Sequence, residues 1–303
     1  MSMAVFAFAE NEAQASALAH ELAAPLHLIG CRSFPDGESL VCVPADAARV
    51  ATAILFRSLN DPNAKLIEIL LAAAALRDNG ARRIMLVAPY FAYMRQDIAF
   101  HPGEAVSQRV IGRLIADHFD GLITIDPHLH RIATLGEVIP GIAATAVPAA
   151  PALAEVLQRD LDPDSILIGP DCESLPWVKK IAELLGTEMM IAEKHRSGDR
   201  EVRLVLPQIE RVRGRPAIIV DDLVSSGSTL IACAAQLRAA GAARVEAVAT
   251  HCLAGAADLA RLRDAGIERL RATDSVPGPA ATIPLAAVLG DAVRALGWID
   301  GAR

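Results

Sequence analysis

Short apolar runs rich in β-branched residues alternate along the chain with longer segments rich in alanine and leucine. The short runs have the length and composition of buried strands, and the longer segments have those of helices. Strands are predicted at 84–88, 122–125, 166–168, 217–220 and 245–249, and helices at 66–77, 106–118, 177–185 and 229–239. Because strand and helix alternate, the pattern predicts α/β architecture with mostly parallel sheets.

An internal similarity adds domain organisation to this pattern. Residues 76–88 resemble residues 237–249 without a gap, and each stretch reads as a helix end, a glycine and a following strand. Such corners look alike in many α/β proteins, but the order of the neighbouring elements also repeats here. We therefore expect two similar domains related by a pseudo-twofold axis, residues 1–146 and 147–303. The tail at 283–298 is predicted to be helical and can pack back on the first domain.

Composition narrows the class of protein. Hydrophobic residues make up 53% of the 303 residues and mean hydropathy is +0.34, which raises the question of a membrane protein. The apolar run at 69–76 is far too short to span a bilayer, and no basic region precedes an apolar core at the N-terminus. We therefore expect a soluble cytoplasmic protein that does not associate with membranes.

Charge and cysteine usage exclude further classes. A net charge of −7 argues against a protein that coats nucleic acid, although a small anionic substrate needs only a local positive site. None of the five cysteines has the spacing of a metal-ligand pair, and their odd number fits reduced thiols.

The strongest local signal is a strand at 217–220 that ends in Asp221 and Asp222 and leads through a polar loop into a helix. The loop residues are Ser225, Ser226, Gly227, Ser228 and Thr229. Free N–H groups and hydroxyls at a helix start suit a phosphate monoester, and glycine lets the backbone approach the anion closely. The alternative is an ordinary serine-capped helix. Paired carboxylates favour the ligand site, because they are costly unless a ligand or cation offsets their charge, and we expect them to hold ribose hydroxyls.

This loop resembles the binding signature for phosphoribosyl pyrophosphate (PRPP) of the type I phosphoribosyltransferase fold. On its own it suits an enzyme that consumes PRPP as well as one that makes it. Four further segments resemble the PRPP synthetase (ribose-phosphate pyrophosphokinase) family, in the family's order and at about its spacing. They are Phe-Pro-Asp-Gly-Glu at 34–38, Pro-Tyr-Phe-Ala-Tyr-Met-Arg-Gln-Asp at 89–97, Asp-Pro-His-Leu-His at 126–130 and Glu-Lys-His-Arg at 193–196.

The resemblance implies two type I phosphoribosyltransferase-like domains and a Mg²⁺-dependent transfer of pyrophosphate from ATP to the 1-hydroxyl of ribose 5-phosphate. It also implies a homo-oligomer in which the 34–38 loop reaches the ATP of a neighbouring subunit. The implied ATP-binding residues are Phe34, Asp36, Gly37, Glu38, Arg95, Gln96 and Asp97. The implied ribose 5-phosphate site contains Arg196, Asp221, Asp222 and the five loop residues.

Physical chemistry agrees with several of these roles. Arg95 offers a rigid fork of donors to ATP phosphates, Gln96 offers an amide, and Phe34 can stack on adenine. The family pattern makes His128 and Asp171 the Mg²⁺ ligands. Because Mg²⁺ prefers oxygen ligands, an alternative is that His128 hydrogen-bonds a phosphate and only Asp171 touches the metal.

Catalysis is expected to depend on two cations near the end of a predicted strand. Lys194 and Arg196 are the expected catalytic residues, since the resemblance implies that their loop closes over the nucleotide, where they would meet charge on the transferring phosphorus. The alternative is a solvated basic patch.

Some positions depart from the usual family pattern. Ser225 stands where the family usually has a carboxylate, and Ser228 where it usually has glycine. The Asp-Pro-His-Leu-His form and the stretch at 100–107 look closer to archaeal-type members.

Two other functions compete with PRPP synthesis. A phosphoribosyltransferase that consumes PRPP would share the phosphate loop but would not need Arg95 and Gln96. A catalytically silent regulatory relative is the second alternative. The joint presence of four residues argues against it: Lys194, Arg196, His128 and Asp171.

Overall fold

The structure is a computed structural model that describes residues 3–47, 49–129, 131–197 and 201–298, with the backbone alone for 194–197 and 201–204. The described chain forms two compact units. Unit 1 comprises the residues up to Pro148 together with the tail from Leu285, and unit 2 comprises Ala149–Pro284. The division expected from the sequence lies at 146–147 and assigns the tail to the second domain, whereas this division places the tail in the first.

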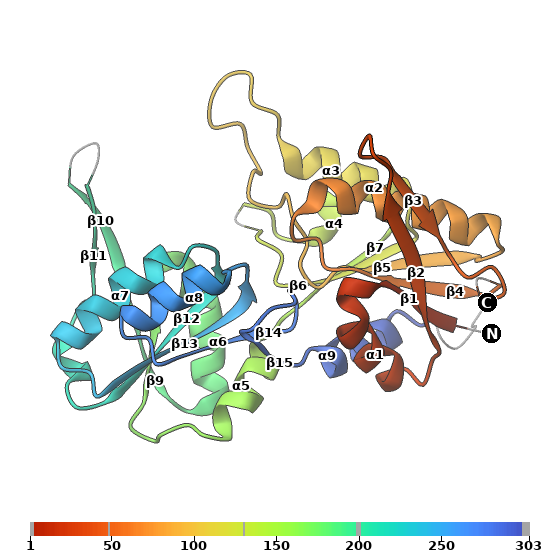
Figure 1. Ribbon diagram of the computed structural model, residues 1–303. Coiled ribbons are helices and arrows are strands. Elements are labelled where there is room, and N and C mark those ends of the chain that lie inside the picture. Colours follow the sequence, from red (N-terminus) through yellow and green to blue (C-terminus); the bar gives the residue numbers. More distant parts are fainter. Residues whose placement is uncertain (1–2, 48, 130, 198–200, 299–303) are drawn as a thin grey trace. The chain divides into compact units, whose positions relative to one another are not determined.

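Unit 1 is built on a seven-stranded sheet with the order β3-β2-β1-β4-β5-β6-β7 (Figure 1). Its strands are β1 Met3–Phe8, β2 Leu26–Ser33, β3 Ser39–Cys42, β4 Thr52–Phe56, β5 Arg83–Val87, β6 Gly121–Ile125 and β7 Ala143–Val147. All neighbouring strands are parallel except β2 and β3, which form an antiparallel hairpin. The order reverses between β1 and β4, which makes that position the topological switch point of the sheet.

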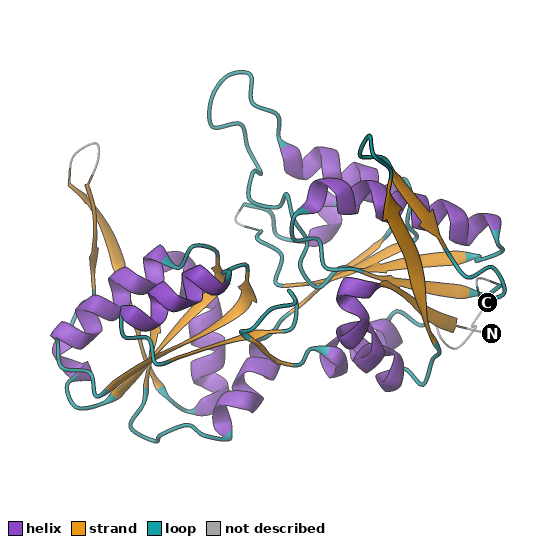
Figure 2. Ribbon diagram, in the orientation of Figure 1, coloured by secondary structure: helices purple, strands orange, loops and turns teal. Residues whose placement is uncertain are grey.

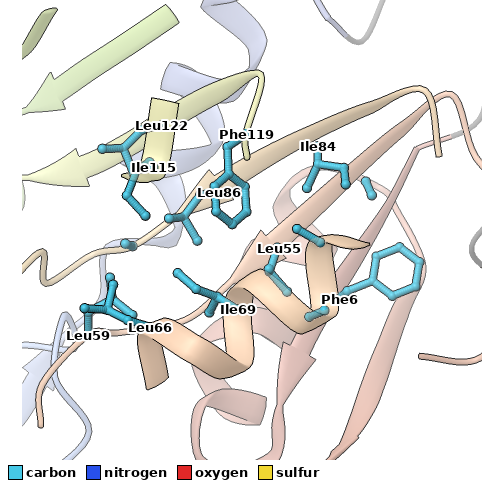
Figure 3. Packing of buried hydrophobic residues seen from close by; sticks show 14 of the residues in the cluster. Phe6, Leu55, Leu59, Leu66, Ile69, Ile84, Leu86, Ile115, Phe119 and Leu122 are labelled. Carbon is cyan, nitrogen blue, oxygen red and sulfur yellow. The ribbon is translucent and has the colours of Figure 1, made fainter. Parts of the chain in front are cut away.

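The core of unit 1 forms where the helices cover this sheet (Figures 2 and 3). The helices are α1 Glu12–Glu21, α2 Pro62–Asp78, α3 Ser107–Ala116, α4 Leu135–Val138 and α9 Ala286–Ala295, with a short 3₁₀ turn at Ala9–Asn11. On α2, Leu66, Ile69, Ala73 and Leu76 are buried, a spacing of three and four that turns one apolar face toward the strands. Figure 3 shows Leu66 and Ile69 among core residues such as Leu55 and Leu86.

The tail belongs to unit 1 through specific contacts. Arg294 on α9 donates from Nη1 to the backbone oxygen of Glu21 on α1 at 3.0 Å. Gly290 faces the same helix so closely that a Cβ atom there would lie 2.6 Å from Cγ of Glu21. Near the end of the described tail, a Cβ atom on Gly121 would lie 2.7 Å from the Trp298 ring. The tail therefore packs on unit 1, with α9 against α1 and Trp298 against the first residue of β6.

Unit 2 has a six-stranded, all-parallel sheet with the order β15-β14-β13-β12-β8-β9. Its strands are β8 Ile166–Gly169, β9 Glu188–Ile191, β12 Pro216–Val224, β13 Arg244–Cys252, β14 Arg269–Thr273 and β15 Ala281–Ile283. Its helices are α5 Ala150–Gln158, α6 Leu175–Leu185, α7 Ser228–Ala239 and α8 Ala256–Asp264, with 3₁₀ turns at Cys172–Ser174 and Ile209–Val212. Strands β10 Glu193–Ser197 and β11 Glu201–Val205 form a separate antiparallel hairpin.

The elements predicted from the apolar pattern are confirmed. The five predicted strands correspond to β5, β6, β8, β12 and β13, and the four predicted helices to α2, α3, α6 and α7. The two similar stretches form equivalent corners, since α2 leads through Gly80 (φ +110°) into β5 and α7 leads through Gly241 (φ +89°) into β13. Both glycines adopt the left-handed conformation that other residues rarely take. Among the described residues, no helix has both the length and the apolar character to cross a bilayer.

Candidate active site

The predicted site residues follow the carboxyl ends of parallel strands in both units. In unit 1, Arg95 lies in the loop after β5 and His128 in the loop after β6. In unit 2, Asp171 follows β8, and the phosphate loop at 225–229 follows β12. Ligands of open α/β sheets bind at this edge. Each unit therefore presents its predicted functional residues at the edge where the fold favours binding.

The switch point of unit 1 is filled by the chain's own side chains. Arg57, directly after β4, is only 4% exposed and pairs with Glu10 at 2.8 Å and with Glu68 at 2.6 Å. Its guanidinium also lies 3.7 Å from the centre of the Phe8 ring. One cation thus meets two carboxylates and an aromatic face here, and these contacts hold the Arg57 guanidinium in place.

The β2–β3 turn presents the predicted adenine-binding residues to solvent. The N–H of Phe34 donates to the carbonyl oxygen of Glu38 at 2.7 Å, and Gly37 adopts φ +92°. Asp36 accepts the Glu38 N–H at 3.2 Å. Phe34 is 37% exposed, and the centre of its ring lies 4.9 Å from the guanidinium carbon of Arg32. The turn is thus closed by backbone bonds, which leaves the Phe34 ring at the surface.

The three side chains of the Arg-Gln-Asp segment at 95–97 lie in different environments. Arg95 is exposed, and the Gln96 amide lies 3.5 Å from Glu104. Asp97 is 5% exposed and accepts from Nη1 of Arg131 at 2.7 Å. Arg131 lies three residues after His128, so this ion pair ties the segment after β5 to the loop after β6.

Of the two predicted metal ligands, only Asp171 offers the oxygen atoms that Mg²⁺ prefers, and the described residues hold no cluster of three or more potential ligands. Asp171 accepts from the backbone N–H groups of Glu173 at 3.0 Å and Ser174 at 3.2 Å through one carboxylate oxygen. These bonds fix the orientation of the carboxylate at the end of β8. His128 is half-buried after β6, in the other unit.

The carboxylates at the end of β12 carry an excess of negative charge that fits a cation or sugar ligand. Burial and the charges of Asp222 and Asp171 raise the pKa of Asp221 from 3.8 to about 8. The Asp222 N–H donates to the Asp221 carboxylate at 3.0 Å, which holds the pair together. A bound cation would offset the charge of the ionised carboxylates, and ribose hydroxyls would donate hydrogen bonds to them.

We expect this carboxyl group to make the ligand-free protein less stable at alkaline pH. Its pKa is raised in the folded state, so its stabilising contribution is complete below pH about 4 and is lost as the pH rises toward about 8. Asp221→Asn removes the ionisable group and should raise Tm at pH 9 by roughly 4 °C. Thermal unfolding from pH 5 to 9 measures this, with Asp264→Asn on the exposed end of α8 as the control. If the difference in Tm between wild type and Asp221→Asn were the same at pH 5 and at pH 9, the raised pKa of Asp221 would be contradicted.

The phosphate loop ends in the left-handed conformation that its glycine allows. Gly227 is the N-cap of α7 with φ +74°, and no described side chain caps this helix start. The hydroxyls of Ser226 and Ser228 lie 3.0 Å apart. The first N–H groups of α7 have no partner within the helix, so they supply donors for an anion.

Gly227→Val should therefore damage sugar phosphate binding selectively. A Cβ atom at this position would lie 2.8 Å from Cδ2 of Leu262, and the positive φ is strained for a β-branched residue. We expect the KM for ribose 5-phosphate to rise about tenfold or more, as a strain of about 1–3 kcal/mol implies, with ATP binding retained. Gly278→Val is the control, because Gly278 has open space around it. Loss of ATP binding with intact sugar binding would show that the two sites are assigned the wrong way round.

The predicted catalytic cations lie on the hairpin of unit 2. In the backbone register of β10 and β11, Lys194 is opposite Leu204 and Arg196 is opposite Val202. The side chains of Lys194 and Arg196 lie outside the described residues. Their assignment as catalytic residues remains a prediction.

In each unit, one arginine that the sequence did not indicate contacts a predicted site residue. Arg131 pairs with Asp97 across 34 positions, and Arg261 on α8 donates to the Ser226 backbone oxygen across 35 positions. Neither belongs to a recognisable local motif, so only the three-dimensional structure reveals them.

The parallel sheets and the phosphate loop, together with a match of residues 146–271 to the phosphoribosyl transferase domain, define a protein of the phosphoribosyltransferase fold class. Residues 3–118 match the N-terminal domain of ribose phosphate pyrophosphokinase. A ribose-phosphate pyrophosphokinase of Methanopyrus kandleri is 34% identical over 97% of this chain and 99% of its own length. The chain belongs to the ribose-phosphate pyrophosphokinase family, and it is an enzyme of that family.

Other relatives agree with this assignment. The ribose-phosphate pyrophosphokinase of Pyrococcus furiosus is 35% identical and covers 86% of this chain and 91% of its own length. A crystal structure of phosphoribosylpyrophosphate synthetase from Mycobacterium smegmatis has a TM-score of 0.84, with 25% identity over 98% of this chain and 99% of that one. The family resemblance, its similarity to archaeal members and the fold class predicted from the motifs are therefore confirmed.

Proposed function

We propose that this enzyme transfers pyrophosphate from Mg²⁺-ATP to the 1-hydroxyl of ribose 5-phosphate, which yields PRPP and AMP. The observation that carries this proposal is the end of β12, where two carboxylates precede a helix start with open N–H donors. This arrangement matches a ribose bearing a 5-phosphate, because the helix start meets the phosphate and the carboxylates accept from the hydroxyls. Family membership supports the direction of the reaction.

The two units divide the substrates in this proposal. Unit 2 binds ribose 5-phosphate through the residues at the end of β12. Unit 1 supplies Arg95 and Gln96 to ATP from the loop after β5, while Asp97 acts through its ion pair with Arg131. The exposed turn with Phe34 and Glu38 binds adenine.

Mg²⁺ would be held by Asp171, with His128 as a second ligand or as a donor to phosphate. When bound, it would neutralise charge on the ATP phosphates. The fixed Asp171 carboxylate and the raised pKa of Asp221 support a cation at this edge of unit 2. The metal site remains part of the proposal.

Catalysis in this scheme is alignment and charge stabilisation. The sugar 1-hydroxyl attacks the β-phosphorus in line with the departing AMP, and Lys194 and Arg196 stabilise charge on the transferring group. No residue is assigned as a general base. We also propose that the enzyme is a homo-oligomer, with the β2–β3 turn of one subunit at the ATP site of another, and that the reaction takes place in the cytoplasm.

The test is the release of AMP and PRPP by the purified protein from ATP and ribose 5-phosphate, with and without Mg²⁺. We expect both products in equal amounts, and only when Mg²⁺ is present. Release of ADP would contradict pyrophosphoryl transfer. An enzyme that produced no PRPP but consumed it in the presence of a nucleobase would be a phosphoribosyltransferase instead.

A further inference from the structure

Helix α8 contacts the phosphate loop at 225–229 through two of its side chains. Nη2 of Arg261 donates to the carbonyl oxygen of Ser226 at 3.0 Å. The same atom pairs with Oδ1 of Asp258 at 2.6 Å, and Oδ2 of Asp258 accepts the Gly255 N–H at 3.1 Å. Arg261 is the main cause that lowers the pKa of Asp258. The guanidinium is thus anchored to the start of its own helix while it reaches the loop.

This contact determines which way one peptide unit of the loop faces. The Ser226 carbonyl and the Gly227 N–H belong to the same planar trans peptide, so they point in opposite directions. Because the carbonyl oxygen is turned toward the Arg261 guanidinium, the Gly227 N–H is turned away from that guanidinium. Gly227 is the N-cap of α7, so this peptide unit directly precedes the first turn of that helix, whose N–H groups have no partner within the helix.

A second, apolar contact comes from the neighbouring residue on α8. Leu262 is 1% exposed, and its Cδ2 atom is the nearest neighbour that a Cβ atom on Gly227 would meet. The Leu262 packing holds the loop against α8, but it does not determine how the plane of the Ser226–Gly227 peptide is rotated. Arg261 is about half exposed, so its truncation leaves the Leu262 packing in place.

We propose that Arg261 is a positioning residue that keeps the Gly227 N–H directed at the phosphate group of ribose 5-phosphate. The inference rests on the proposed function. Without Arg261, the Ser226–Gly227 peptide can rotate and present its carbonyl oxygen to the phosphate. An oxygen in that place repels the anion, and one donor is lost.

The expected result is a change in one kinetic constant. Arg261→Ala should raise the KM for ribose 5-phosphate about tenfold, which corresponds to about 1.4 kcal/mol, with the KM for ATP unchanged. Calorimetric titration with ribose 5-phosphate, in the presence of a non-hydrolysable ATP analogue, should show the same loss. Arg261→Lys should recover most of the affinity, because an ammonium can donate to the carbonyl. Arg263→Ala is the matched control, since it removes an exposed arginine from the same helix.

Other outcomes overturn the inference. An unchanged KM for ribose 5-phosphate in Arg261→Ala, or an equal rise in both KM values, shows that Arg261 does not orient the peptide. Should Arg261→Ala fail to fold, Asp258→Asn is the second variant, because its amide oxygen can still accept the Gly255 N–H. It should raise the same KM about threefold, and no rise would again overturn the role. A wild-type enzyme that makes no PRPP contradicts the proposed function instead.

Discussion

Lys194→Ala is expected to lower kcat for PRPP formation by about a hundredfold or more, with only a modest change in the KM of either substrate. The physical reason is that charge builds up on the transferring phosphorus only during the reaction. An ammonium that meets this charge stabilises the transition state more than the bound substrates. Steady-state kinetics with AMP release as the readout measures the effect.

Two further variants make this result specific to Lys194. Lys180→Ala removes an exposed lysine from α6 and should leave kcat unchanged. Lys194→Arg keeps the charge but changes its geometry, so we expect partial activity. A Lys194→Ala enzyme with normal kcat would remove this residue from the mechanism.

The sequence predicted the parts of the site that are local in the chain. The end of β12, the loop at 225–229 and the start of α7 are consecutive, so one stretch of residues contains the donors and the carboxylates. The corners at Gly80 and Gly241 are local for the same reason, because helix, glycine and strand follow one another directly.

The remaining features depend on contacts between distant residues. The family resemblance implies that Asp97 binds ATP. The structure adds an ion pair between Asp97 and Arg131, and the sequence contains no pattern that joins these two residues. The neutralisation of Arg57 by Glu10 and Glu68 likewise requires the order of β1, β4 and α2 in space. Ion pairs between residues that are far apart in the chain cannot be predicted from the spacing of residues within a short segment.

Two inactive variants test whether one active site is built from two subunits. Phe34→Ala combined with Glu38→Ala should abolish adenine binding, while the turn itself survives because its closing bonds join backbone atoms. Lys194→Ala should abolish chemistry in a second batch of protein. Each variant alone should be nearly inactive.

Mixing the two variants with subunit exchange should restore activity, up to about a quarter of wild type. If one subunit provides Lys194 and its neighbour provides the turn, random pairing across an isologous dimer leaves one site in four without a defect. If each site were instead built from a single chain, every site in the mixture would carry one of the two defects. Differently tagged subunits that co-purify would demonstrate exchange, and exchange without recovered activity would refute a site shared between subunits.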